Sequence, residues 1–422
     1  MSEMFKAPKG TYDVVAPFSV TWLTVRDALG ESARLSGYDY IETPIFEDTN
    51  LFIRGVGGST DVVNKEMYTF EDRSGRSLSL RPEGTAGVLR AMLENRLDRG
   101  ALPAKVWYCG PNFRYEQPQS GRYRQHTQVG VETIGSSDPA LDAEIIWMAV
   151  YGPRKVLGLK NVRLLINSLG CHECRPNYRQ VLTSFLNDLQ LDEPTRERAA
   201  LNPLRVLDDK REEVQRQLVN APLIADHLCD ACREHHVQVL EYLDRMNVSY
   251  EKAPRLVRGL DYYVRTTFEL IHEGLGAQSA IGGGGRYDGL IETLGGPALA
   301  GIGFGLGVDR TCLAVEAEDI DLTQNQKQSV YLIASSQDGM KTGMKIVTEL
   351  RQAGFCAEIA FDGRSMKAAM KGADRSGAKL ALILGDDELA RGEVSVKDLD
   401  SGEQTTVALE LLESYISSRF EN

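Results

Sequence analysis

Arg258-Gly-Leu-Asp-Tyr-Tyr263 leads directly into a β-branched and aromatic run at 264–270, and Ile281-Gly-Gly-Gly-Gly-Arg-Tyr-Asp-Gly289 follows soon after. The first stretch places an arginine, an aspartate and two tyrosines at the start of a strand. In the second, four consecutive glycines let a ligand approach the backbone closely, because they carry no side chain. The Arg-Tyr-Asp that follows offers a charge and an aromatic wall. Together the two stretches predict a ligand site built on the strands of a sheet.

The size and composition indicate a multidomain globular protein. A chain of 422 residues is too long for one core and predicts two or three domains. Hydrophobic residues make up 42% of it, and no apolar run is long enough to span a membrane. Residues 1–6 lack the apolar segment of a signal peptide, so we expect a cytoplasmic protein that does not bind membranes. The net charge of −12 argues mildly against nucleic-acid binding, but RNA contacts need only a local basic surface.

Helix and strand patterns alternate up to residue 316. Apolar residues at helical spacing predict helices at 18–36, 83–97 and 138–150. Strand patterns occur at 38–43, 104–114, 125–135, 161–167, 263–272 and 278–283. A polar loop at 115–124 joins two of these strands, and Gly301-Ile-Gly-Phe-Gly-Leu-Gly307 leads into a helix near Val308. Strands with helices set beside them predict an antiparallel sheet in an α+β domain.

Two segments interrupt or end this pattern. Residues 171–248 are charged and helical in pattern, so we interpret them as a small helical insertion. Residues 317–328 are polar and predict a linker. Beyond it, strands at 330–334, 356–360 and 380–384 alternate with helices at 338–352, 365–376 and 408–419. This order predicts a compact α/β domain at 329–422.

Two arginines stand at the ends of predicted strands. Arg114 precedes the loop Tyr115-Glu-Gln-Pro-Gln-Ser-Gly121, and Arg310 begins a helix after a glycine-rich strand. Guanidinium groups at the rim of a sheet suit phosphate recognition, because they bind oxygens in pairs and stay charged. Taken singly, each is more often a surface salt-bridge residue, and this interpretation remains open at this point.

The motifs resemble those of the histidyl-tRNA synthetases, which are class II aminoacyl-tRNA synthetases. The resemblance rests on the two opening stretches, on Arg81-Pro-Glu-Gly-Thr85, and on Phe113-Arg114 with Arg122-Tyr-Arg-Gln125. It runs from Lys9-Gly-Thr-Tyr-Asp13 to the C-terminal domain. It implies a class II catalytic core at 1–170 and 249–316, the helical insertion at 171–248, and an anticodon-binding domain at 329–422. Residues 48–65 resemble the region after motif 1, whose Pro44 belongs to a dimer interface in the family.

The same resemblance implies how ATP is bound. Arg114 and Arg310 match the arginines of class II motifs 2 and 3, which bind the α-phosphate with the substrate carboxylate and the γ-phosphate, respectively. Glu116 and Arg122 would contact the nucleotide from the motif 2 loop. Gln117 stands where relatives often carry an arginine, and this departure bears on how the loop holds the tRNA acceptor end.

The amino-acid pocket must read an imidazole and an ammonium group. Neutral imidazole offers one donor and one acceptor, so a carboxylate with a tyrosine hydroxyl serves both. The resemblance implies Glu132 and Tyr263 at the imidazole, Glu83, Thr85 and Gln128 at the α-amino group, and Tyr262 and Tyr287 as further histidine-binding residues. Taken one by one, solvated carboxylates and core aromatics are equally good interpretations of these residues.

Arg258 is the most distinctive residue. In the family this arginine approaches the α-phosphate from the side opposite Arg114, so both are expected to be catalytic. Charge develops on the phosphorus during adenylation, and preorganised cations stabilise it. No nucleophile–base pair indicates a covalent enzyme intermediate. The resemblance implies Mg2+ together with the ATP.

Two CxxC pairs bracket the insertion: Cys171-His-Glu-Cys174 and Cys229-Asp-Ala-Cys232. Four thiolates at this spacing suit a tetrahedral structural Zn2+. Buried or loosely paired thiols are the alternative, and both remain open.

In the C-terminal domain, Lys367, Lys371 and Arg375 recur every four residues and place three charges on one helix face. A solvated face and a contact with tRNA phosphates are equally compatible with this pattern.

The pattern as a whole predicts a homodimeric histidine–tRNA ligase that uses L-histidine, ATP and tRNA(His). One alternative is a catalytically silent histidine sensor that resembles the regulatory subunit of ATP phosphoribosyltransferase. The C-terminal domain and both ATP arginines argue against it. The other alternative is a class II synthetase for threonine, proline or glycine, which would not account for 258–263 and 282–287.

Overall fold

The computed structural model describes residues 4–58, 60–209, 211–322 and 329–420. They divide into two compact units, one within 1–322 and one within 323–422. Of the linker expected at 317–328, residues 323–328 lie outside the described residues. The part before them belongs to the first unit, because Ile320 and Leu322 pack against its core.

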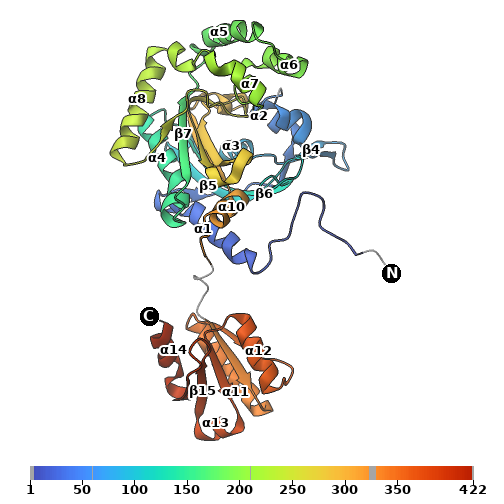
Figure 1. Cartoon of the computed structure of the whole chain (residues 1–422), viewed down its shortest axis with the longest axis vertical. Helices are drawn as coiled ribbons and strands as arrows, with labels where there is room; N and C mark the ends of the chain where they lie inside the picture. The colour runs from blue at the N-terminus through green and yellow to red at the C-terminus, as the bar shows by residue number, and fades with distance from the viewer. Residues whose placement is uncertain (1–3, 59, 210, 323–328, 421–422) are drawn as a thin grey trace. The chain divides into compact units, whose positions relative to one another are not determined.

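The first unit is built on a mainly antiparallel sheet (Figure 1), which has eight strands among the described residues. Their order across the sheet is β1 (Asp39–Tyr40), β5 (Ala104–Phe113), β6 (Gln125–Ile134), β11 (Gly301–Gly307), β10 (Ala280–Arg286), β9 (Val264–His272), β7 (Val162–Ser168) and β8 (Glu251–Lys252). The two edge pairs, β1 with β5 and β7 with β8, are parallel. The strand expected at 38–43 shortens to two residues, and the one expected at 278–283 begins at Ala280 and continues to Arg286.

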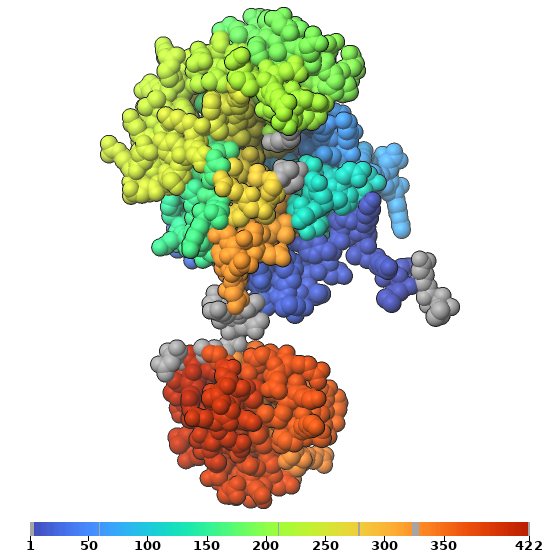
Figure 2. All heavy atoms as spheres, in the orientation of Figure 1, coloured from blue at the N-terminus to red at the C-terminus, as the bar shows by residue number. Residues whose placement is uncertain are grey.

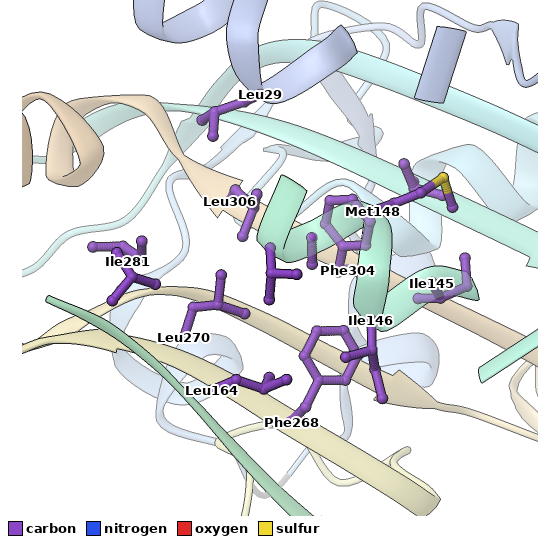
Figure 3. Close-up of a cluster of buried hydrophobic side chains, with 14 of the residues drawn as sticks. Leu29, Ile145, Ile146, Met148, Leu164, Phe268, Leu270, Ile281, Phe304 and Leu306 are labelled. Atoms are coloured by element: carbon purple, nitrogen blue, oxygen red, sulfur yellow. The ribbon is translucent and has the colours of Figure 1, made fainter. Parts of the chain in front are cut away.

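One face of this sheet carries the main core. Helices α1 (Phe18–Leu35), α4 (Pro139–Val150) and α10 (Val308–Ala317) supply apolar side chains to it. Ile302, Phe304 and Leu306 belong to this core from β11. Figure 3 shows Phe304 and Leu306 among residues such as Leu29 and Ile146. Because side chains alternate along a strand, Gly303 and Gly305 face the other side of the sheet. That side is therefore open to a ligand.

A second, smaller sheet in the first unit is formed by residues of the N-terminal third of the chain. Its strand order is β2 (Phe46–Asp48), β4 (Ser77–Leu80) and β3 (Thr69–Glu71). Helices α2 (Thr49–Val56), α3 (Thr85–Glu94) and α9 (Leu290–Thr293) accompany it, with α3 and α9 sharing one hydrophobic cluster. The sequence patterns predicted α3 but not this sheet, since its strands are only three or four residues long.

The insertion is helical, as expected. It contains α5 (Arg175–Asn187), α6 (Glu193–Leu201), α7 (Glu212–Gln217) and α8 (Asp230–Arg245). In Figures 1 and 2 its green atoms gather at one end of the unit, while α8 runs beside α4. The insertion has its own cluster, to which Tyr178, Leu182 and Cys232 belong. The second half of α8 belongs instead to the main core, because Val239 and Leu243 pack there.

The second unit is an α/β domain with helices on both faces of its sheet. The strand order is β13 (Cys356–Ile359), β12 (Ser329–Ala334), β14 (Leu380–Leu384), β15 (Glu393–Asp398) and β16 (Gln404–Ala408). The helices are α11 (Gln337–Gln352), α12 (Met366–Ser376), α13 (Asp386–Arg391) and α14 (Leu412–Phe420). The first three strands in this order are parallel, and β15 and β16 continue antiparallel. The sequence pattern predicted the strands that form β12, β13 and β14 but not the hairpin of β15 and β16.

Candidate active site

A cavity of about 480 Å³ opens on the glycine-rich face of the main sheet. Six residues that the sequence assigned to ATP, catalysis or histidine line it: Arg114, Glu116, Arg122, Gln128, Arg258 and Arg310. They come from β5 and its following loop, from β6, from the segment before β9, and from α10. Segments almost two hundred residues apart therefore meet in one cavity.

Three arginines in this cavity are held in place by fixed acceptors. Arg114 Nε donates to the Pro82 carbonyl at 2.9 Å, and Arg310 Nε donates to the Gly121 carbonyl at 2.7 Å. Arg258 Nη1 donates to Glu269 Oε1 at 3.0 Å. Burial acts to lower the pKa of Arg258, but Tyr263 and Glu269 outweigh it and raise that pKa. The cavity thus presents preorganised cations, which suits a polyphosphate.

His126 also lines the cavity and is neutral there. Burial, with Arg114 and Arg310 nearby, lowers the pKa of His126 to about 3. An imidazolium would add a further positive charge to a buried, already cationic site, so the neutral form is favoured.

The loop after β5 folds over the rim of the cavity. Glu116 and Arg122 form an ion pair, and the Arg124 guanidinium lies 3.8 Å from the centre of the Tyr115 ring. The N-terminal segment borders this loop, since the Arg124 amide donates to the Gly10 carbonyl at 2.8 Å. The Tyr12 hydroxyl donates to Asp309, the neighbour of Arg310. The Lys9–Asp13 motif is thereby brought beside the cavity residues Asp309 and Arg310.

Glu132 lies in a buried cluster of hydroxyl groups, outside the lining of the cavity. Thr85 Oγ1 donates to Glu132 Oε1 at 2.7 Å, Tyr287 Oη donates to Oε2 at 2.6 Å, and Tyr108 Oη donates to Oε1 at 3.3 Å. Burial raises the pKa of Glu132 to about 8, despite these hydrogen bonds. Its carboxyl group is therefore mostly protonated at pH 7 without a ligand.

The Glu83 side chain is hydrogen-bonded to the start of helix α3. Its two carboxylate oxygens accept from the Thr85 and Ala86 amides at 2.8 and 2.9 Å. These are the first amides of the helix, which have no acceptor within the helix itself. Burial raises the pKa of Glu83. The residue expected at the α-amino group thus also caps this helix.

Tyrosines connect the Glu132 cluster with the cavity. The Arg258 guanidinium lies 5.6 Å from the centre of the Tyr263 ring. Tyr262 packs against Tyr263 with ring centres 4.6 Å apart, and its edge meets the Tyr287 ring at 6.0 Å. The predicted histidine-binding tyrosines therefore form one continuous group from Arg258 to Glu132.

The glycines at 282–285 lie alternately on the two faces of the sheet. A Cβ atom on Gly283 would lie 2.7 Å from Arg258 Nη1, so only glycine admits the arginine there. Gly282 and Gly284 face the core instead, where Cβ atoms would meet Leu306 and Phe304. Because strand residues alternate between the faces, a side chain at either position would enter the core, yet the main chain of Gly282 and Gly283 lines the cavity.

Arg286 does not supply a charge to the site, contrary to the sequence-based expectation. It is fully buried, and its Nε donates to Asp142 Oδ1 and Oδ2 at 2.8 and 3.0 Å. His235 Nε2 lies 2.8 Å from Asp142 Oδ2. This cluster ties β10, α4 and α8 together, so the charge of Arg286 stabilises the fold near the site.

The four cysteines of the two CxxC pairs meet at one point. The Sγ atoms of Cys171, Cys174, Cys229 and Cys232 all lie within 4.8 Å of one another. Measured contacts are 3.7 Å for Cys171–Cys174, 3.8 Å for Cys171–Cys229 and 3.9 Å for Cys174–Cys232. In a tetrahedral site with Zn–S bonds of about 2.3 Å, neighbouring sulfurs lie about 3.8 Å apart. The residues present therefore fit zinc.

The basic residues of the C-terminal domain share an exposed face of α12. Lys367, Lys371 and Arg375 are all exposed, while Ala369 and Ala373 are buried against the sheet.

No described helix, in either unit, is both long and apolar enough to cross a membrane.

Known proteins share this arrangement over nearly the whole chain. Residues 10–311 match the family model described as histidyl-tRNA synthetase, and residues 329–419 match an anticodon binding domain. A histidine–tRNA ligase from Streptomyces avermitilis is 55% identical over 416 residues, which cover 98% of this chain and 99% of the relative. One from Corynebacterium efficiens is 58% identical over 405 residues, covering 96% and 94%.

The chain belongs to the histidyl-tRNA synthetase family.

Solved structures of the family agree with the fold. Apo histidyl-tRNA synthetase from S. aureus superposes with a TM-score of 0.82 at 35% identity, covering 99% of this chain and all of that one. A Bacillus halodurans protein described as an ATP phosphoribosyltransferase regulatory subunit/histidyl-tRNA synthetase shares the fold, with a TM-score of 0.66 at 20% identity over 91% of this chain.

For a histidyl-tRNA synthetase, the sequence missed three residues that border the cavity: His126, Glu269 and Asp309. Two of them left a signal in the sequence. His126, Gln128 and Glu132 lie an even number of residues apart on β6 and so share a face. Glu269 is a carboxylate in an otherwise apolar stretch of β9. Asp309 carried no such signal beyond its place beside Arg310.

Proposed function

We propose that ATP binds in the arginine-lined cavity, and that histidine binds between the ATP α-phosphate and the Glu132 cluster. The chain is a histidine–tRNA ligase, which activates histidine with ATP to histidyl-adenylate and transfers the histidyl group to the 3′ end of tRNA(His). The observation that best supports the site is the meeting of Arg114, Arg258 and Arg310 in one cavity.

Each arginine has a separate role in this proposal. Arg114 and Arg258 bind the α-phosphate from two sides and are the catalytic residues. Arg310 binds the γ-phosphate, while Glu116 and Arg122 contact the nucleotide from the loop. The carbonyl and carboxylate partners that orient these guanidinium groups before ATP arrives support these roles.

The chemistry follows from this placement. An oxygen of the histidine carboxylate attacks the α-phosphorus, and pyrophosphate leaves with the electron pair of the broken P–O bond. Charge shifts onto the α-phosphate oxygens and the leaving group, where fixed cations stabilise it without reorganisation. Holding the carboxylate in line with the phosphorus removes much of the entropic barrier. A hydroxyl of the terminal adenosine then displaces AMP from the acyl carbon.

Histidine selectivity is assigned to Glu132 and Tyr263. Imidazole needs one donor and one acceptor, and a buried carboxyl group of pKa about 8 can switch between the two as the ligand enters. Thr85, Gln128 and Glu83 are proposed for the α-amino group, with Tyr262 and Tyr287 as the walls of the pocket. The tyrosine chain that runs from Arg258 to Glu132 supports this assignment.

Two metals belong to the proposal. Mg2+ prefers oxygen ligands and is bound largely through substrate phosphates, and Glu116 and Glu269 offer carboxylates in the cavity. It would neutralise charge on the ATP phosphates. Zn2+ is assigned to Cys171, Cys174, Cys229 and Cys232 as a structural ion, on the sulfur spacing described above.

The remaining partners are tRNA(His) and a second copy of the chain. The exposed face with Lys367, Lys371 and Arg375 is proposed to contact tRNA phosphates. A homodimer is supported by exposed apolar residues beside Pro44, namely Tyr40, Ile45 and Phe46. We assign the protein to the cytoplasm, where its tRNA substrate is charged.

Histidine-dependent exchange of pyrophosphate into ATP tests the function directly. We expect exchange that requires histidine, and charging of tRNA(His) when the tRNA is added. Histidine binding without exchange would instead support a catalytically silent histidine sensor. Exchange with threonine, proline or glycine in place of histidine would refute the assigned pocket.

A further inference from the structure

The segment that carries Arg258 and Tyr263 is held at its far end by the cysteine cluster. Arg175 follows Cys174 directly and begins helix α5. Its Nε donates to the Leu169 carbonyl at 3.2 Å, and its Nη2 donates to the carbonyl of Tyr263. One guanidinium therefore links the cluster to the end of β7 and to the main chain of a predicted histidine-binding residue.

A second set of contacts reaches the same place through the backbone. The Leu169 amide donates to the Arg265 carbonyl at 2.7 Å, and the Arg265 amide donates to the Gly170 carbonyl at 2.8 Å. Gly170 has φ +64°, and a Cβ atom there would lie 2.6 Å from Cys174 Sγ. The strand pairing of β7 with β9 thus continues directly into the cysteine loop.

The backbone at this point is strained in a way that aims Tyr263. Arg265 has φ +49°, which is rare for a residue with a side chain. The pairing of β9 with β10 shifts register here, since Gly285 pairs with Thr267 but Arg286 pairs with Val264. Such bulges redirect a side chain beside a site, and they persist only where the surroundings hold them.

Packing alone does not hold the segment from the insertion side. A cavity of about 270 Å³ lies behind it, lined by Arg175, Arg258, Leu260 and Asp261 among others. Across this space Asn202 and Arg205 bond the Asp261 side chain, whereas Arg175 and Gly170 bond the main chain at Tyr263 and Arg265. The contacts of Arg175 and Gly170 in turn depend on the loop from Cys171 to Cys174, where the Cys171 amide donates to Cys174 Sγ at 3.0 Å.

We infer that the metal-bound cysteine cluster sets the position of Tyr263 through Arg175, and so controls histidine affinity from outside the pocket. This inference rests on the zinc site and the histidine pocket of the proposed function. Bound zinc would hold the four sulfurs at fixed distances. The contacts of Arg175 and Gly170 would then fix the backbone at Val264–Thr266 relative to the cluster. Arg175 is then a positioning residue, since it touches neither substrate.

The consequence is a selective effect on histidine. Arg114 and Arg310 are anchored to Pro82, Gly121 and Ala280, and Arg258 is anchored to Glu269, so the bonds that fix the ATP arginines are separate from those made by Arg175 and Gly170. Loss of the metal or of Arg175 should therefore weaken histidine binding far more than ATP binding.

The test compares full-length wild type with Arg175→Ala and with Arg216→Ala, a control on α7 of the insertion whose side chain is 74% exposed and pairs with Glu212. Metal content is measured by elemental analysis, and Co2+ replacement reports tetrahedral thiolate ligation by its absorption. We expect about one zinc per chain in all three proteins. Arg175→Ala should raise the histidine KM in pyrophosphate exchange about tenfold, while the ATP KM changes less than about twofold. Arg216→Ala should match wild type.

Chelation then completes the cycle. Metal-free wild type should show at least the rise in histidine KM of Arg175→Ala, and removing metal from Arg175→Ala should add less than it does in wild type, because the two changes share the Arg175 contact. A metal-free wild type as isolated, or an unchanged histidine KM in Arg175→Ala, would overturn the inference. So would general unfolding on chelation, with loss of helical circular dichroism and of ATP affinity. Absence of any histidine-dependent exchange in loaded wild type would instead mean that the proposed function has failed.

Discussion

Residues of one type take opposite roles in this protein according to where they lie. Arg258 and Arg286 both come from the two stretches that drew attention first. Arg258 lies against Gly283 and lines the cavity, whereas Arg286 is fully buried with Asp142 on the core side. A buried charge needs a paired partner, so Arg286 is used to hold elements together. Among the contacts described, Glu269 is the only ion-pair partner of Arg258. The Arg258 guanidinium therefore remains available to bind a phosphate in the cavity.

Arg258→Ala should slow adenylation far more than it weakens substrate binding. Loss of one preorganised charged donor costs about 10²–10³-fold in rate, because the charge it stabilises develops only in the transition state. Single-turnover formation of histidyl-adenylate measures the rate, and Arg216→Ala on the exposed surface of α7 is the control. An intact rate with only a raised histidine KM would show that Arg258 merely binds substrate.

Glu132 should make the stability of the free protein depend on pH. Burial raises its folded pKa to about 8, from an ordinary value of 4.5. Between these pH values the folded chain keeps a proton that the unfolded chain releases, so stability falls as pH rises. This group contributes roughly 1.4 kcal/mol per pH unit across that window, and its favourable contribution is complete below it.

Glu132→Gln removes this titration. Thermal melts of the ligand-free proteins from about pH 5 to pH 9 should show the variant gaining on wild type as pH rises through the window. Glu132→Gln also keeps the size of the side chain and its oxygen acceptor. Parallel melting profiles for the two proteins would contradict a protonated Glu132.

At the scale of elements, glycine alternation and helix faces decide what is exposed. On β11 the residues Ile302, Phe304 and Leu306 fill the core, so the glycines between them leave the opposite face bare for a ligand. On α12 the small residues Ala369 and Ala373 pack against β12, which leaves the basic residues in solvent. In both elements, the residues that pack against the core on one face leave the opposite face open to solvent or to a ligand.

Neutralising the face of α12 should weaken tRNA binding. Lys367→Gln, Lys371→Gln and Arg375→Gln together remove three charges, so affinity should fall and its dependence on salt should flatten by about two to three counterions. Lys341→Gln with Lys345→Gln on α11 is the control, because that helix packs against a different cluster of the domain. Histidine-dependent exchange should not change. An unaltered salt dependence would leave α12 as a merely solvated face.

At the scale of the whole molecule, chemistry and the expected anticodon contacts belong to different units. Every residue assigned to ATP, histidine or zinc lies before Leu322, and the clusters of the first unit contain no residue beyond it among those described. The second unit has its own core of strands and helices. Each unit thus holds the buried apolar surface that independent folding needs.

A chain truncated after Leu322 should still form histidyl-adenylate. It should charge tRNA(His) poorly, because contacts at the anticodon end would be lost while the acceptor end remains bound. Exchange and charging assays on the same preparation separate these effects, and sedimentation checks that the truncated chain keeps the oligomeric state of the whole protein. Charging equal to that of the full chain would refute the role given to residues 329–422.

The sequence by itself determined the class of fold and the family, and it singled out the arginines that the structure brings to one cavity. Helical and strand periodicity placed α1, α3, α4 and most long strands, because alternating burial leaves a pattern along the chain. Short strands such as β2 to β4 carry too few residues for a pattern, and the hairpin β15–β16 was missed as well. The motif arginines were recognisable since a phosphate site demands that residue type at fixed places relative to strands.

Only the tertiary structure decided which groups are charged, buried or coupled. The protonation of Glu132, the neutral state of His126 and the burial of Arg286 depend on neighbours from distant segments, and desolvation has no signature in a linear sequence. The same holds for Arg175, which reads as one more charged residue in a polar helix. Its link to Tyr263 spans 88 positions and exists because β7 and β9 are neighbours in the sheet.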